Sequence, residues 1–219
     1  MKRSTFLLST TTLLAALLTG CSQEAGPQNR GVYLLMDTSG TYAKELKDAV
    51  QLINVILVKL EPGDSFAVAS IDTGSFSEKD IIAKVTFDTR PSAANRQKRK
   101  FREKVDEFIK QVKPAAFTDI TGGVLQAIEY LNEKGPGIKE ILIYSDLKED
   151  LPKGFVRDIP LQLQGFNVVA LNVTKLSSDN RDPREYLTRL EGWQNRVEGG
   201  GGQWLVINDM DRLDRILVN

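Results

Sequence analysis

The sequence predicts an α/β domain with a doubly wound, mostly parallel open sheet, one antiparallel edge strand, and helices on both faces. Near-continuous apolar runs at 32–36, 141–145 and 168–171 are typical of parallel strands that are covered on both faces. Amphipathic stretches with apolar residues three and four positions apart lie between such runs and predict helices. Residues 72–80 are too few to carry a crossover helix, so the strand that follows them should return antiparallel.

The first half of the chain supplies two parallel strands, a helix and the edge strand. After the strand at 32–36, apolar residues recur on one helical face from Tyr42 to Leu60, and Pro62-Gly63 should end that helix. Asp64–Ile71 is the second predicted strand. Ile81–Phe87 would then pair with it as a short antiparallel edge strand, which is a common way for a mostly parallel sheet to end.

The second half alternates helices with strands in the same way. The expected elements are a helix over 101–112, a helix over 124–131 after Pro114, strands over 141–145 and 168–171, a helix over 186–193, a break at Gly199–Gly202, a strand over 204–207, and a terminal helix from Asp211 that turns Leu213, Ile216 and Leu217 inward. The alternation predicts one domain.

Arg96 to Lys100 form the one strong charge run. Cations are disfavoured near a helix N-terminus by the helix dipole, so we expect the adjacent helix to begin after this run. A solvated helix face is the ordinary interpretation of such a run. An acidic partner surface and anionic lipid headgroups are the alternatives.

The N-terminus has the pattern of an export signal. Met1-Lys2-Arg3 is cationic, and the apolar or hydroxyl stretch Phe6–Leu18 is shorter than the ~20 residues that a membrane-spanning helix needs. Leu18-Thr19-Gly20-Cys21 resembles the lipobox of bacterial lipoproteins, which implies cleavage before Cys21 and lipidation of its thiol. An ordinary signal peptide or a buried thiol remains open. Ser22 resembles the outer-membrane sorting pattern, which implies a lipid-anchored protein of the bacterial cell envelope that faces the periplasm from the outer membrane.

These features divide the chain into a signal peptide (1–20), a tether (21–30) and one domain (31–219). Removal of residues 1–20 takes away Lys2 and Arg3, so 27 basic residues would face 29 acidic ones. That balance gives no reason to expect nucleic acid as a partner. A lipidated Cys21 would leave no other cysteine for a disulfide. The chain has no histidine, which excludes Ser-His-Asp hydrolysis, Cys-His chemistry and His-ligated zinc.

Oxygen-bearing side chains follow two of the predicted strands and precede one helix. Asp37, Ser39 and Thr41 come directly after the first strand, Thr118 lies in the loop before the helix over 124–131, and Asp146 ends the strand over 141–145. Carboxyl ends of neighbouring parallel strands meet at one edge of an open sheet, where ligands bind. Two carboxylates brought together repel each other unless a cation or proton separates them. This pattern indicates a hard divalent ion such as Mg²⁺.

These residues resemble a von Willebrand factor type A domain over nearly the whole of 31–217. In that family Asp-x-Ser-x-Ser, a threonine on a later loop and an aspartate ending the fourth strand form the metal-ion-dependent adhesion site. The resemblance implies Asp37, Ser39, Thr41, Thr118 and Asp146 as metal ligands, with the aspartates often acting through water. Thr41 replaces the last serine of the motif, and Leu147 stands where the family usually has glycine.

The resemblance also implies a function. It predicts a non-enzymatic protein that binds a protein partner, with an aspartate or glutamate of the partner completing the coordination of Mg²⁺, and it suits a scaffold or assembly role. Mn²⁺ and Ca²⁺ also accept oxygen ligands, so the ion stays open. Asp72 and Asp119 are candidates for a supporting position around the site.

Other interpretations of the same residues remain. Thr118 could be only a helix N-cap, Ser39-Gly40 only a turn, and Asp146 only a loop residue. A Mg²⁺-dependent phosphotransferase of the haloacid dehalogenase type also has an aspartate after its first strand, but Ser39 replaces its second aspartate. An aspartic protease would need all-β surroundings. A small-molecule-binding lipoprotein commonly has two lobes, whereas the 199 residues after the signal look like one.

Overall fold

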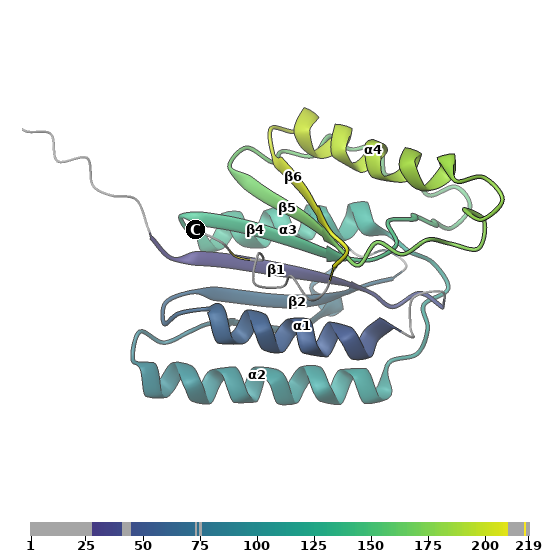
Figure 1. Ribbon diagram of the computed structural model, residues 1–219. Coiled ribbons are helices and arrows are strands. Elements are labelled where there is room, and N and C mark those ends of the chain that lie inside the picture. The colour runs from purple at the N-terminus through teal and green to yellow at the C-terminus, as the bar shows by residue number, and fades with distance from the viewer. Residues whose placement is uncertain (1–27, 41–44, 73, 75, 210–216, 218–219) are drawn as a thin grey trace, which may run out of the picture.

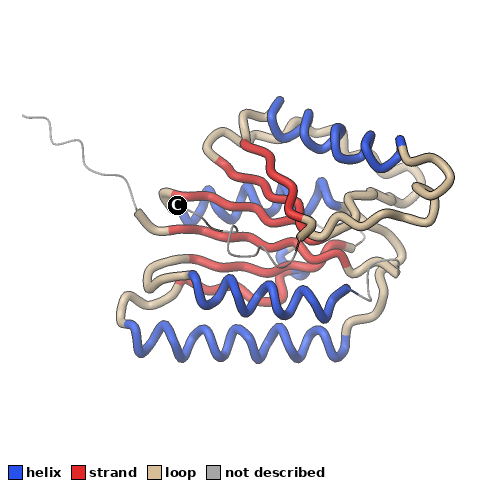
Figure 2. The backbone as a smooth tube through the Cα atoms, in the orientation of Figure 1, coloured by secondary structure: helices blue, strands red, loops and turns tan. Residues whose placement is uncertain are grey.

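The computed structural model describes residues 28–40, 45–72, 74, 76–209 and 217. Its sheet has six strands in the order β3-β2-β1-β4-β5-β6. All neighbouring strands are parallel except β2 and β3, which are antiparallel. The predicted doubly wound sheet with one antiparallel edge strand is therefore confirmed (Figure 2).

The strands and helices alternate along the chain as the sequence predicts. Their bounds are β1 Arg30–Asp37, α1 Leu46–Lys59, β2 Ser65–Ile71, the 3₁₀ helix η2 Glu78–Asp80, β3 Ile81–Thr86, α2 Pro91–Gln111, α3 Ile120–Lys134, β4 Ile138–Tyr144, β5 Phe166–Leu171, α4 Arg184–Gly199 and β6 Gln203–Ile207. Residues 211–216 of the expected terminal helix, like Tyr42 at the expected start of the first helix, lie outside the described residues. Leu217 is described and packs, partly buried, against the core.

Helices cover both faces of the sheet, with α1 and α2 on one side and α3 and α4 on the other (Figure 1). β1 is buried along its whole length between the two layers. Successive strand residues point to opposite faces, so Leu34 and Met36 pack toward α1 and α2, while Tyr33 and Leu35 pack toward α3 and α4. The central strands are fully enclosed, which explains why their sequences are apolar without alternation.

Helix α2 begins earlier than predicted. It starts at Pro91, so the charge run Arg96–Lys100 lies inside it, and the expectation of a later start is wrong. Proline is favoured in the first helical turn because its fixed φ suits the helix and its missing N–H has no partner there. Buried Ala93 and Ala94 also pack the first turn onto the core, which outweighs the modest dipole penalty of the cations.

The connection between β4 and β5 contains no helix. Residues 145–165 cross the N-terminal end of α3 as an irregular segment. Its Arg157 side chain forms an ion pair of 2.8 Å with Asp119, and its Glu149 carboxylate accepts a hydrogen bond of 2.7 Å from the backbone N–H of Thr121. The segment is thus fastened to the start of α3. None of the helices in the described part of the chain is both long enough and apolar enough to cross a lipid bilayer.

Candidate metal site

Asp37 ends β1, and its carboxylate organises the loop that follows. The side chain is fully buried. Its Oδ1 accepts a hydrogen bond of 2.8 Å from the backbone N–H of Ser39, and its Oδ2 accepts one of 2.7 Å from the hydroxyl of Ser145. The first contact closes a tight turn, since an aspartate that bonds two residues onward mimics a backbone turn. The second contact ties the end of β1 to the end of β4.

Asp146 follows β4, the strand next to β1, and is 3% exposed. The register pairs Met36 with Tyr144, so Asp37 and Asp146 emerge at the same edge of the sheet. Oδ1 of Asp146 accepts a hydrogen bond of 2.8 Å from the backbone N–H of Lys148. Burial raises the pKa of Asp146, and the negative charge of Asp37 raises that pKa further. The two carboxylates are therefore close enough to repel each other.

Thr118 enters from a third loop and is 4% exposed. It forms a two-way backbone pair with Asp150, with N···O distances of 2.7 and 3.0 Å. In the same loop, the N–H of Ala115 donates to the carbonyl of Thr38 at 2.8 Å. The loop before α3 is thereby joined to the loop after β1 and to the loop after β4. Together with the bond from Ser145 to Asp37, these contacts connect all three loops in a closed ring.

The structure places four of the five predicted site residues on connected loops. Asp37, Ser39, Thr118 and Asp146 lie on this ring of loops, and all four are buried. Thr41 lies outside the described residues. The role of this set as metal ligands stays a prediction.

The two aspartates considered for supporting positions lie beside each other. The backbone N–H of Asp119 donates to the carbonyl of Asp72 at 3.3 Å. The carboxylate of Asp119 caps α3 by accepting a hydrogen bond of 2.8 Å from Gly122, and it also pairs with Arg157. Burial, followed by the charge of Asp119, raises the pKa of Asp72. Asp119 therefore stabilises the start of α3.

The donor chemistry fits a hard cation. Within the described ranges, no three histidine, cysteine or acidic side chains gather in a way that could hold a metal ion. The candidate site is instead composed of two buried carboxylates and the hydroxyls of Ser39 and Thr118. Such an all-oxygen set suits Mg²⁺, which keeps several waters and needs few protein ligands. A cation would also offset the repulsion that raises the pKa of Asp146.

Comparison with known proteins agrees with this architecture. No family model matches the sequence, and no curated protein matches it. The structure of a von Willebrand factor type A protein from Catenulispora acidiphila aligns over 85% of this chain and 40% of its own, with a TM-score of 0.52 and 15% identity. The chain has the von Willebrand factor type A fold. The pilus adhesin SpaC from Lactobacillus rhamnosus GG, in an open conformation, aligns over 88% of this chain and 29% of its own, with a TM-score of 0.50 and 11% identity. This chain spans less than half the length of either protein.

Sequence reasoning missed Ser145, which supports the carboxylate of Asp37 at the candidate site. Ser145 is fully buried and donates to Asp37, while its oxygen accepts a hydrogen bond of 3.1 Å from the N–H of Leu147. Its place immediately before Asp146 was the only signal, because a serine at a strand end is otherwise unremarkable.

A buried ion pair beneath the Asp146 loop was also missed. Arg189 on α4 donates to both carboxylate oxygens of Asp179, at 2.8 and 2.7 Å, and its Nε donates to the backbone carbonyl of Asp146 at 3.2 Å. Asp179 is 2% exposed, and Arg189 lowers its pKa to about 2. The pair holds the backbone of the Asp146 loop against α4. No local pattern links residues from three separate segments, so this ion pair could not be predicted from the sequence.

Leu147 has an unusual backbone conformation for its residue type. Its φ is +64°, in the left-handed region that glycine adopts without strain. The side chain is 2% exposed and packs in the cluster beneath α3 and α4, and the carbonyl accepts a hydrogen bond of 3.2 Å from the indole N–H of Trp193. The fold therefore retains the backbone turn although the residue is leucine. Burial of the side chain offsets the strain.

Proposed function

We propose that this protein binds a protein partner through a divalent cation at the site described above. Asp37, Ser39, Thr41, Thr118 and Asp146 would hold the ion. The observation that supports this most directly is that two buried carboxylates and the hydroxyl residues Ser39 and Thr118 lie on one closed ring of loops. Mg²⁺ is the first expectation, with Mn²⁺ and Ca²⁺ as alternatives that also accept oxygen ligands.

The aspartates would offer charged oxygens to the ion, and the hydroxyl residues would offer neutral ones. Both oxygens of Asp37 already accept a hydrogen bond, which fixes the carboxylate and leaves further lone pairs for a ligand water. Ser39, Thr41 and Thr118 would offer neutral oxygens. When bound, the ion supplies an electrophilic position that a carboxylate of the partner can complete. The small protein charge at the site therefore favours an acidic partner group.

We infer a lipid-anchored location from the N-terminal sequence. Cys21 after Leu18-Thr19-Gly20 would carry the acyl groups, and Ser22 favours the outer membrane of a bacterial envelope. A single acyl-anchored domain with one binding site suits a scaffold or assembly role. This location would place the domain in the periplasm.

We also propose that the protein is not an enzyme. Ser39 stands where a haloacid dehalogenase-type phosphotransferase would need its second aspartate, and the chain has no histidine. Position 39 therefore lacks the carboxylate that would act as general acid or base in such a phosphotransferase. Hydrolysis of phosphate monoesters with Mg²⁺, abolished in Asp37→Asn, would instead support the phosphotransferase alternative.

The test is metal binding by a hydroxyl-deleted variant. Ser39→Ala/Thr118→Ala should lower the affinity for Mg²⁺ or Mn²⁺ at least tenfold in titration calorimetry, because it removes two neutral ligands. Ser65→Ala/Thr86→Ala is the matched control, since it deletes a hydroxyl pair 2.9 Å apart at the opposite end of β2. Capture of an envelope partner should disappear with a chelator. Equal metal affinity in the site variant and the control would contradict the proposal.

A further inference from the structure

Helix α2 carries an uneven charge along its length. Its first ten residues, 91–100, contain Arg96, Lys98, Arg99 and Lys100 and no acidic residue. The remaining residues, 101–111, contain three basic and three acidic residues. The helix is thus strongly cationic in its N-terminal half and balanced in its C-terminal half.

This charge opposes the stability of the helix. The N-terminal end of a helix dipole favours negative charge, yet the first turn of α2 contains no acid. Arg96, Arg99 and Lys100 are exposed and share one face through three- and four-residue spacing. None of the three forms an ion pair within the described part of the chain. Arg96 attracts the carboxylate of Asp88, but that attraction does not account for Arg99 and Lys100.

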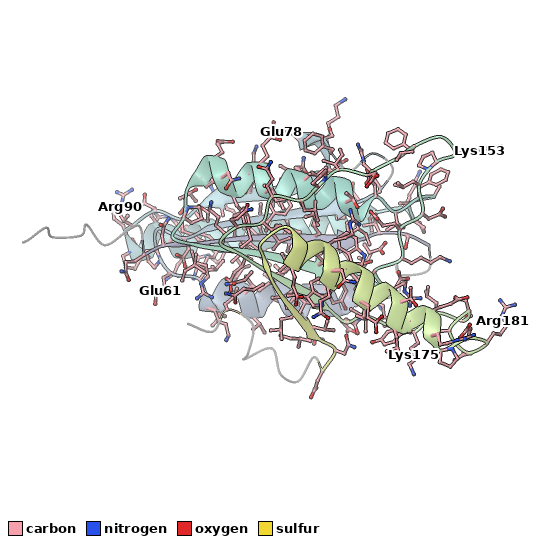
Figure 3. The ribbon with its side chains drawn as sticks, turned by 90° about the horizontal axis from the view of Figure 1, so that it is seen from above. Glu61, Glu78, Arg90, Lys153, Lys175 and Arg181 are labelled. Atoms are coloured by element: carbon pink, nitrogen blue, oxygen red, sulfur yellow. The ribbon has the colours of Figure 1, made fainter. Side chains whose placement is uncertain are left out.

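The cationic half of α2 lies at the end of the molecule where the predicted tether joins the domain. The side chain of Asn29 donates to the carbonyl of Gly63 at 3.4 Å, and the N–H of Gly63 donates to the carbonyl of Phe87 at 3.0 Å. The N–H of Asp88 then donates to the side chain of Gln97 at 2.8 Å. Hydrogen bonds thus lead from the start of β1 to the first turns of α2. Figure 3 shows Glu61 and Arg90 at this end, with Lys153, Lys175 and Arg181 at the other.

The predicted tether is short enough to bring this helix to a membrane. Seven residues separate Cys21 from Asn29, so the eight Cα–Cα steps between the two span at most about 29 Å. The cationic half of α2 covers about 15 Å of helix from its start. Attraction between charges fades over about 8 Å at physiological ionic strength, so the helix would have to lie against the surface itself. The tether allows that contact.

We propose that the exposed cationic face formed by Arg96, Arg99 and Lys100 docks on anionic phospholipid headgroups. This inference rests on the lipid anchor of the proposed function but is independent of the metal site. Contact along α2 would lay the domain on its side and keep the metal site, at the other end of the strands, open to a partner. Clustered cations beside a membrane anchor gain affinity for anionic lipid with each added residue.

The experiment measures vesicle binding without the acyl anchor. The chain from residue 21 onward, with Cys21→Ser, contains every residue that the structure describes. It is sedimented with phosphatidylethanolamine/phosphatidylglycerol vesicles and, separately, with neutral phosphatidylcholine vesicles. We expect binding to the anionic vesicles alone, lost as salt is raised and unchanged by a chelator. Unchanged binding with the chelator separates this surface from the metal site.

Charge deletions test the position of the surface. Arg96→Gln/Arg99→Gln/Lys100→Gln should weaken binding to anionic vesicles about a hundredfold, at roughly fivefold per basic residue. The matched control, Lys153→Gln/Lys175→Gln/Arg181→Gln, removes the same charge from the opposite end and should bind as before. Circular dichroism checks that both variants fold. Equal losses in the two variants, or no preference for anionic vesicles in the parent chain, would overturn the proposal. Charge-dependent capture of an acidic protein with no vesicle binding would do the same.

Discussion

The hydroxyl of Ser145 donates a 2.7 Å hydrogen bond to Oδ2 of Asp37, across 108 positions of the sequence. Both side chains are fully buried, so neither group can exchange this partner for bulk water. The bond fixes the end of β1 to the end of β4 at the point where the candidate metal site begins. The bond joins the carboxylate of a predicted metal ligand directly to the neighbouring strand.

Removal of that hydroxyl should affect both stability and metal binding. Ser145→Ala leaves Oδ2 of Asp37 and the N–H of Leu147 without their buried partner, which should lower the free energy of unfolding by about 1–3 kcal/mol. Urea unfolding measures this loss, and calorimetry should show weaker Mg²⁺ binding. Ser65→Ala, a buried serine at the far end of β2, should leave metal affinity unchanged. Unaltered metal binding in Ser145→Ala would show that Asp37 does not need this support.

The buried ion pair between Arg189 and Asp179 should stabilise the fold more than an exposed ion pair at the start of the same helix. Arg189→Ala leaves the carboxylate of Asp179 buried without its cation, which should cost about 3–5 kcal/mol of stability. It also removes the donor to the carbonyl of Asp146, so metal affinity should fall.

Arg184→Ala provides the control for that change. Arg184, the first residue of the same helix, forms an ion pair of 2.9 Å with Asp182 just before it, but both side chains are exposed. Its loss should leave the unfolding curve and the metal affinity unchanged, because exposed pairs contribute little. Similar losses in the Arg184 and Arg189 variants would contradict the assignment.

At position 147, the glycine variant should be more stable than the alanine variant, which reverses the usual order of stability. Both Leu147→Ala and Leu147→Gly remove a buried side chain and should destabilise the protein by about 2–5 kcal/mol. Glycine adopts a φ of +64° without strain, so Leu147→Gly should be the more stable of the two by about 1 kcal/mol. At Leu142, inside β4, glycine should be the less stable. Urea unfolding of the four variants tests this, and the same order at both positions would count against the left-handed turn.

The raised pKa of Glu140 should make the stability of the fold depend on pH. Glu140 is 5% exposed and lies 3.2 Å from Arg30, whose charge lowers its pKa, but burial outweighs that effect and raises the pKa to about 7. The folded state therefore holds a proton that the unfolded state releases between about pH 4.5 and 7. Stability should fall as the pH rises through this window, by on the order of 3 kcal/mol.

Unfolding by urea at pH 5, 6, 7 and 8 measures that slope. Glu140→Gln should flatten it, because glutamine cannot lose a proton. Glu133→Gln removes an exposed carboxylate from α3 and should keep the slope of the parent chain. Asp80, with a pKa raised to about 6 mainly by burial, acts in the same direction, as do Asp72 and Asp146, so these carboxylates should contribute the slope that remains. A parent chain whose stability rises across this window would refute the assignment.

Much of the fold could be predicted from the sequence because each strand has a local signal in its own residues. The apolar runs of β1, β4 and β5 follow from burial on both faces, and the short gap before β3 dictates its antiparallel direction. The predicted start of α2 was wrong because the penalty from the helix dipole is small. Packing of Ala93 and Ala94 outweighs it, and that packing depends on core contacts that cannot be seen in the sequence.

The site was predictable to the extent that it follows strand ends. Asp37 and Asp146 could be placed together because neighbouring parallel strands end at one edge. Ser145 and Arg189 could not, since their importance depends on hydrogen bonds to residues far away in the chain. Supporting contacts of this kind have no periodicity and no spacing rule.

The ring of loops around Asp37 also bears on which cation the protein would accept. Backbone pairs and buried side-chain bonds already fix the spacing between the loops in the protein alone. A cage with fixed dimensions selects by ionic radius: Mg²⁺ demands bonds of about 2.0–2.1 Å, whereas Ca²⁺ takes more oxygens at about 2.3–2.6 Å and suits a pliable shell. Stiffness in this ring would thus favour the smaller ions over calcium.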